Sequence, residues 1–162
     1  MIVLLGYDTN NMKLSTRTQY GLRMLCQLAI EHDKGSIQMG EIGDREGISE
    51  KYLGQIMLIL KSSGLVLSVR GAQGGYYLSR SPDRIGLLEI FEILEGEIFD
   101  FGEETAPDAS AVSKENRKDT LSATNEIWVR IRESIKEVLD KYTLDDVVRL
   151  GLFRTGYLDY RI

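Results

Sequence analysis

The residues best suited to bind another molecule lie in two neighbouring segments. In the first, Ser49 opens an apolar pattern, and Glu50, Lys51, Tyr52 and Gln55 follow it with hydrogen-bonding side chains. In the first turns of a helix that enters the major groove of DNA, such side chains read the edges of the bases. Gln55 is suited to adenine, and Lys51 to guanine or a phosphate. The alternative is that all of them form a solvated helix surface.

The second segment is a predicted β-hairpin, with strands over residues 65–70 and 76–78 joined by a glycine-rich turn. Glycines let a backbone approach DNA closely, and an arginine at the tip fits the electronegative minor groove. The alternatives are an ordinary hairpin turn and a phosphate loop. The second lacks the Gly-Lys-Ser/Thr ending and would precede a helix, not a strand. The hairpin residues assigned to DNA are Arg70, Gly71, Gln73, Gly74, Gly75 and Tyr76.

Three predicted helices position these segments. Ser15 is suited to cap a helix that ends near Glu31, a short helix follows over residues 39–45, and Ser49 caps a third that reaches about residue 63. The short helix is expected to break at Gly47, and Gly64 stands where a left-handed helix stop is expected. Two helices joined by a glycine turn, followed directly by a hairpin, predict a winged helix-turn-helix over residues 12–84. The fold class is therefore mainly α with a small β-hairpin wing.

The remaining chain is divided by pattern. Residues 1–11 are interpreted as a disordered N-terminal extension, and 85–124 as a short helix (87–94) with an acidic loop. Asn125 is predicted to cap a long helix that reaches about residue 142, and Thr143 is predicted to cap a last helix over 144–150. Residues 125–150 are interpreted as a dimerisation region, and 151–162 as a C-terminal tail. An apolar stripe on the long helix packs against a second subunit, or alternatively folds back on its own domain. Its members are Ile127, Trp128, Ile131, Ile135, Val138 and Leu139.

Charge and composition narrow the function classes. The net charge is −5, but residues 12–84 hold ten bases and seven acids, which fits a DNA-binding part joined to an acidic partner-binding part. One cysteine (Cys26) and one histidine leave no disulfide and no cysteine-held metal, and we interpret Cys26 as a buried apolar residue. Nothing pairs a nucleophile with a base, so we expect no enzyme, metal or cofactor. Without an apolar run of about 18 residues we expect no membrane span and a cytoplasmic protein.

Residues 13–22 (KLSTRTQYGL), 48–53 (ISEKYL) and 64–76 resemble the Rrf-two (Rrf2) family of winged-helix transcription regulators, in the family's order and spacing. The resemblance runs from residue 13 to 96. It implies a homodimer on the long helix and a palindromic double-stranded operator, usually for repression. By position it implies base reading by Lys51, Tyr52 and Gln55, with Arg70 in the minor groove. Arg17 and Tyr20 of the first helix complete the predicted DNA-binding set. Gly54 departs from the glutamate of many members, which leaves the operator sequence open.

Well-known members of this family hold an iron–sulfur cluster with three cysteines after residue 96, but residues 97–124 contain none, so we reject cluster sensing. Residues 125–133, 136–140, 143–146 and 156–158, with the terminal Ile162, resemble a cluster-free branch that represses cysteine and sulfur metabolism genes. That branch acts with O-acetylserine thiol-lyase, which binds peptides ending in isoleucine. The resemblance implies that Tyr160, Arg161 and Ile162 form such a tail, the alternative being a frayed terminus. A protein-interaction module without DNA binding and a regulator of another metabolic or stress pathway stay open as alternatives.

Overall fold

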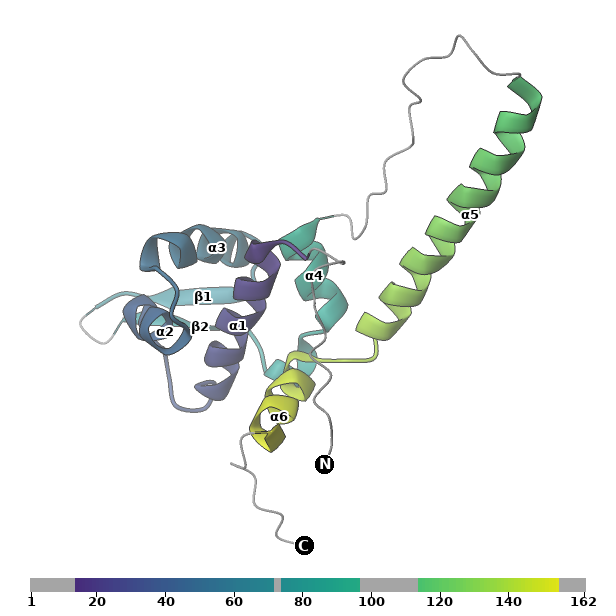
Figure 1. Ribbon diagram of the computed structural model, residues 1–162. Coiled ribbons are helices and arrows are strands. Elements are labelled where there is room, and N and C mark those ends of the chain that lie inside the picture. The colour runs from purple at the N-terminus through teal and green to yellow at the C-terminus, as the bar shows by residue number, and fades with distance from the viewer. Residues whose placement is uncertain (1–13, 72–73, 97–113, 155–162) are drawn as a thin grey trace, which may run out of the picture.

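The computed structural model describes residues 14–71, 74–96 and 114–154, and it describes side chains over 14–71, 74–96 and 125–152 (Figure 1). The predictions on residues 1–11, on Gln73 and on the tail Tyr160, Arg161 and Ile162 lie outside the described residues. The described elements are α1 (Thr16–Ile30), α2 (Met39–Glu46), α3 (Glu50–Ser62), β1 (Val66–Val69), β2 (Gly75–Leu78), the 3-10 turn η1 (Pro82–Arg84), α4 (Leu87–Glu95), α5 (Lys114–Leu139) and α6 (Leu144–Arg154).

The predicted caps and stops fix the helix-turn-helix. The Ser15 side chain accepts a hydrogen bond from the Thr18 amide, and Ser49 accepts one from the Tyr52 amide, so both hydroxyls satisfy a free donor at a helix start. Gly47 (φ 66°) ends α2 and Gly64 (φ 77°) follows α3, both in the left-handed region. These four positions confirm the predicted boundaries of the three helices.

The core lies where α1, α3 and α4 pack together and the hairpin closes one side. Leu25, Leu53 and Ile90 are fully buried in it, and Leu144 at the start of α6 joins them. Because α6 packs along α1 (Figure 1), the end of the described chain belongs to the same apolar core as the helix-turn-helix. The buried apolar side chains provide the main driving force that holds these helices in place.

The hairpin is antiparallel, with Val66 opposite Leu78 and Val69 opposite Gly75. Its return strand makes a further bridge to Ile37, just before α2, through two backbone hydrogen bonds of 3.0 and 2.9 Å between Ile37 and Tyr76. The hairpin is therefore attached to the segment that leads into α2, as well as lying beside α3.

The long helix differs from its prediction. It begins at Lys114 instead of at Asn125, and it ends at Leu139 instead of near Tyr142. The prediction of a loop over 114–123 was wrong because acidic and small polar residues were weighted as loop formers, although this segment contains no proline or glycine and is rich in good helix formers. The helix leads away from the domain core (Figure 1).

A backbone strap joins the end of α5 to the start of α4. Gly86 and Thr143 form an isolated antiparallel bridge, with the Leu87 amide donating to the Tyr142 carbonyl (2.9 Å) and the Leu144 amide to the Ile85 carbonyl (2.8 Å). Thr143 also caps α6 as predicted. Its backbone amide donates to the Asp146 carboxylate, and the backbone amide of Asp146 donates to the Thr143 hydroxyl. Among the described helices, none has a stretch that is both long and apolar enough for a bilayer.

Candidate nucleic-acid interface

Helix α3 presents a polar face beside a buried one. Leu53, Ile56 and Leu60 point into the core, whereas Lys51 and Gln55 are exposed one turn apart. Ser49, which was also predicted to contact DNA, is the N-cap of this helix, and its hydroxyl accepts a hydrogen bond from the Tyr52 amide at 3.4 Å. The structure thus leaves Lys51 and Gln55 as the predicted base-reading side chains that are free to meet a groove.

Glu50 lies against the neighbouring helix. A methyl group built on Gly40 of α2 would lie 3.2 Å from the Glu50 Oε1 atom, and one built on Gly43 would lie 3.7 Å from its Cγ atom. This carboxylate therefore covers the surface of α2, away from the side of α3 that carries Lys51. An acid in the first turn also favours the helix electrostatically.

Tyr52 and Tyr20 form a packed pair. Their rings meet edge to face at 5.7 Å between centroids, and the Arg23 guanidinium lies 5.4 Å from the centre of the Tyr20 ring. Arg23 is itself held by Glu46 at 2.7 Å. The two tyrosines were predicted to contact DNA, and their rings join the first helix to the recognition helix.

Arg17 lies where the start of α1 meets α3. A hollow of about 550 Å³ between these helices is lined by Arg17, Tyr52 and Gln55, so residues more than thirty positions apart meet at one surface. The start of α1 is fixed by Glu95, whose carboxylate accepts hydrogen bonds from the Ser15 amide (3.2 Å), the Ser15 hydroxyl (2.7 Å) and the Thr18 hydroxyl. Burial acts to raise the Glu95 pKa, but these hydrogen bonds outweigh it and leave the pKa below its usual value.

The wing needs its glycines for steric reasons. Gly71 has φ 123°, and a side chain at Gly74 would meet the Val69 carbonyl oxygen at 2.7 Å. A side chain at Gly75 would meet the Ile37 carbonyl oxygen at 2.5 Å. The glycines therefore allow backbone segments of the turn to pack closely against each other. Arg70, beside the turn, is an exposed cation.

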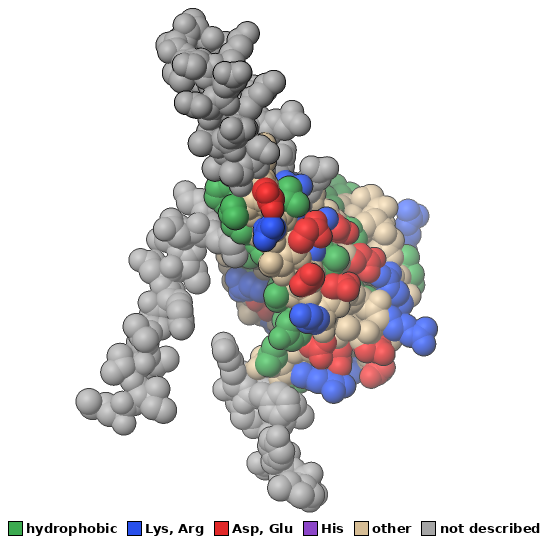
Figure 2. Space-filling model, turned by 90° about the vertical axis from the view of Figure 1, so that its right-hand side faces the viewer, with side chains coloured by type: hydrophobic (Ala, Val, Ile, Leu, Met, Phe, Trp, Pro, Cys, Tyr) green, Lys and Arg blue, Asp and Glu red, His purple; other side chains and the backbone are tan. Residues whose placement is uncertain are grey.

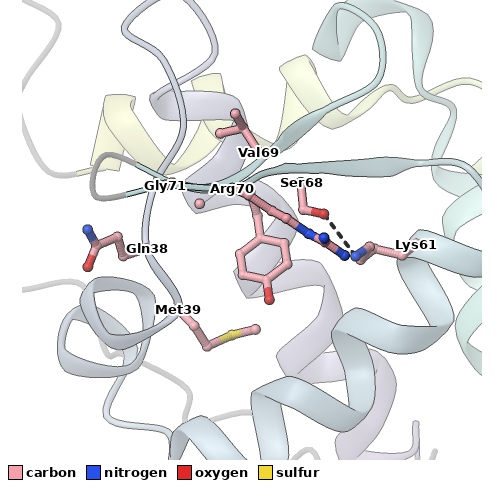
Figure 3. Close-up of a pocket in the computed structure, with 10 residues that line it drawn as sticks. Gln38, Met39, Lys61, Ser68, Val69, Arg70 and Gly71 are labelled. Carbon is pink, nitrogen blue, oxygen red and sulfur yellow. Dashed lines mark hydrogen bonds between the residues drawn. The ribbon is translucent and has the colours of Figure 1, made fainter.

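A second hollow, of about 620 Å³, separates the wing from the end of α3 (Figure 3). Lys61 donates to the Ser68 hydroxyl at 2.9 Å and lies 5.9 Å from the centre of the Tyr76 ring. Arg70 from the wing and Lys61 from α3 both line this hollow (Figure 3). Two cations that line one hollow are suited to bind an anion such as a backbone phosphate.

Sequence reasoning missed Lys61 and Ser68. A signal was present, because alternation along β1 puts Ser68 on the same side as the buried Val66, which faces α3. The approach of Lys61 to that strand depends on how the hairpin folds back, which the local pattern does not specify.

The cations of this surface have no carboxylate partners among the described residues. In the described part of the domain, Arg23 pairs with Glu46, Arg45 with Glu31 and Glu41, and Arg80 with Glu89. Over the same ranges, Lys51, Lys61 and Arg70 form no ion pair with a carboxylate. Their charge is therefore available to an external polyanion, although the whole chain is acidic.

Cys26 is unsuited to ligating a metal cluster. Burial in the side of α1, and then the charge of Glu46, raise its pKa to about 11, so the thiolate that a cluster needs is strongly disfavoured. Since the sequence has no other cysteine, its residues do not fit an iron–sulfur cluster held by thiolates. No group of three potential metal-binding side chains occurs among the described residues either.

The predicted dimerisation stripe divides along α5. Ile127 and Val138 are more than half exposed, and Trp128 and Ile131 are about two-fifths exposed. Ile135 is half-buried, and Leu139 packs against the core of its own chain. Figure 2, which views the molecule from the side of α5, shows hydrophobic side chains along one edge of the described surface, next to mixed acidic and basic ones.

The capped recognition helix, the glycine-rich wing and the unpaired cations between them define a winged-helix transcription regulator, a class of regulatory protein and not an enzyme. A family model described as "Iron-dependent Transcriptional regulator" (Rrf2) matches residues 14–150, and the chain belongs to this family. The family resemblance and the fold class drawn from the sequence are thereby confirmed.

Particular relatives place the chain within the family. It is 40% identical over 136 residues to the HTH-type transcriptional regulator CymR of Bacillus subtilis (strain 168), covering 84% of this chain and 89% of that protein. The solved structure of CymR, the global cysteine regulator of B. subtilis, has a TM-score of 0.66 at 34% identity, covering 91% of this chain and 99% of that one. The structure of T. potens IscR has a TM-score of 0.68 at 35% identity, covering 87% and 89%.

Proposed function

We propose that this protein is a DNA-binding repressor that acts as a homodimer in the cytoplasm. Each subunit places α3 in the major groove of one half of a palindromic operator, with the wing alongside. The observation that carries the proposal is a set of cations without carboxylate partners. Lys51 lies at the start of α3, the recognition helix, and Lys61 and Arg70 line one hollow between α3 and the wing. Lys51 and Gln55 meet the bases, while Lys61 and Arg70 engage the adjacent phosphates and minor groove.

The test is a fluorescence titration of DNA selected from the organism's own genomic fragments, repeated at several salt concentrations. Each lost phosphate contact makes the slope of log affinity against log salt less steep by about 0.9. Arg70→Ala removes one contact from each of two subunits, so the slope should change by roughly two units. The matched control is Arg149→Ala, an exposed arginine on α6, whose removal should leave both affinity and slope unchanged.

The proposal fails if the protein binds selected, random and genomic duplexes equally weakly even in dilute buffer. That result would favour the alternative of a protein-interaction module that keeps the winged-helix fold. If binding is specific but Arg70→Ala has the affinity and salt dependence of the wild type, the proposed DNA binding stands. The proposed contact of Arg70 with DNA is then refuted.

We further propose that the target genes belong to cysteine and sulfur metabolism, with O-acetylserine thiol-lyase as co-repressor. Support comes from the 40% identity to CymR, whose solved structure is described as that of a global cysteine regulator, and from the resemblance of the tail to that of the cluster-free branch. Deleting Ile162 should abolish binding to the purified lyase and leave the dimer intact. Retained lyase binding by the deletion variant would end this part of the proposal.

A further inference from the structure

One exposed stripe of α3 combines polar and apolar positions. Lys51, Gln55 and Leu58 follow one another at spacings of four and three, so they share a face of the helix. Leu58 is 70% exposed, more than any other large hydrophobic side chain in the described part of the chain. The remaining leucines of this helix, Leu53 and Leu60, are fully buried.

Gly54 lies on the same face and has no internal explanation. A methyl group built on it would have no neighbour within 4 Å, and its φ is not in the left-handed region. Neither packing nor backbone conformation within the chain therefore requires glycine, although glycine weakens a helix interior. Leu58 is equally unexplained, because water surrounds its side chain in the isolated subunit.

Both residues are accounted for by a surface outside the chain that approaches this face. The charges around it identify that surface, because Lys51 on the same stripe and the Lys61–Arg70 pair beside it lack carboxylate partners. The edge of a thymine carries a methyl group into the major groove, and it is the apolar group by which a side chain recognises that base. A helix without a side chain at position 54 comes closer to the bases, which brings Leu58 within reach.

We propose, on the basis of the proposed function, that Leu58 reads thymine in the operator through the 5-methyl group, with Gly54 providing the clearance. Gln55, next to this contact, pairs with an adjacent adenine, so the centre of each half-site contains an A·T step. The specificity of this chain then rests on an apolar contact by Leu58, with no side chain at position 54 to hold the helix away from the bases.

The experiment replaces each thymine of a selected operator, one position at a time in both half-sites, by deoxyuridine. This change removes only the methyl group and keeps base pairing. Burying one methyl group corresponds to a roughly three- to fivefold change in affinity, so loss in both half-sites should weaken wild-type binding roughly ten- to twenty-fivefold at one thymine position. Leu58→Ala should bind less tightly and be insensitive to deoxyuridine at that position. The effects of losing the leucine side chain and of losing the thymine methyl group should not add, because the two groups contact each other.

Leu150→Ala is the matched control, because Leu150 is another exposed leucine but lies on α6, outside the recognition helix and the wing. This variant should keep the wild-type pattern of sensitivity to deoxyuridine. The inference is overturned if no thymine methyl group affects wild-type binding, or if Leu58→Ala is as sensitive as the wild type; specific DNA binding would then still stand. A protein that selects no duplex refutes the proposed function itself.

Discussion

Replacing Gly54 by alanine should make the protein more stable. Glycine in a helix interior is about 1 kcal/mol less favourable than alanine, because the unfolded chain loses more freedom on folding. The added methyl group meets nothing within 4 Å in α3, so no steric cost offsets this gain. For a chain of this size, about 1 kcal/mol corresponds to a rise in melting temperature of roughly 2–4 °C.

Two other helical glycines provide controls of opposite sign. A methyl group at Gly43 would lie 2.9 Å from the Ile48 carbonyl oxygen, and one at Gly21 would lie 2.6 Å from the Leu94 side chain, which is fully buried. Backbone and core atoms cannot move aside cheaply, so Gly43→Ala and Gly21→Ala should each lose about 1–3 kcal/mol.

The measurement is thermal and urea unfolding followed by circular dichroism, with all variants at one protein concentration because dimerisation shifts apparent stability. An unchanged or lower melting temperature for Gly54→Ala, or a stabilised Gly43→Ala, would refute the geometric reasoning. If clearance at position 54 serves DNA binding, Gly54→Ala should also bind its operator less tightly despite its greater stability, an exchange of stability for function.

Three further predictions concern other parts of the molecule. Glu95→Gln should lower the free energy of unfolding at pH 7, and because the folded-state pKa of Glu95 lies below 4.5, the difference should vanish in urea titrations as the pH falls through that lower pKa. Cys26, with a pKa near 11 against 9.0 for a free thiol, should react with iodoacetamide at pH 8 roughly a hundredfold more slowly than in the unfolded chain; equal rates would contradict the burial. Ile131→Asp should yield a monomer in sedimentation equilibrium with an unchanged circular dichroism spectrum, whereas a persisting dimer would exclude α5 as the interface.

The fold was largely predictable because its boundaries are encoded by single residues. Ser15 and Ser49 cap helices through their own hydroxyls, and Gly47 and Gly64 adopt the left-handed conformation that ends them. Such signals act over three or four positions and can be read locally. The start of α5 had no comparable signal, since its first turns are polar on every side and were interpreted as a loop.

The candidate site was predictable only where it is local. Lys51, Gln55 and Arg70 were identified because a helix start and a hairpin tip expose their side chains. Lys61 was missed, since its role depends on the distance between α3 and the folded-back wing. The pairing of Tyr20 with Tyr52 likewise depends on how two helices cross, and periodicity contains no information on that crossing.

The bridge between Gly86 and Thr143 has a consequence for how this family diversifies. It joins the two ends of the part of the chain that contains α4 and α5 by backbone hydrogen bonds, so residues added or lost between α4 and α5 leave the junction in place. The entropy of closing a loop changes slowly with its length, which keeps such changes inexpensive. One winged-helix body is thereby compatible with connecting segments of different length between α4 and α5, and a change there needs no redesign of the wing or of α3.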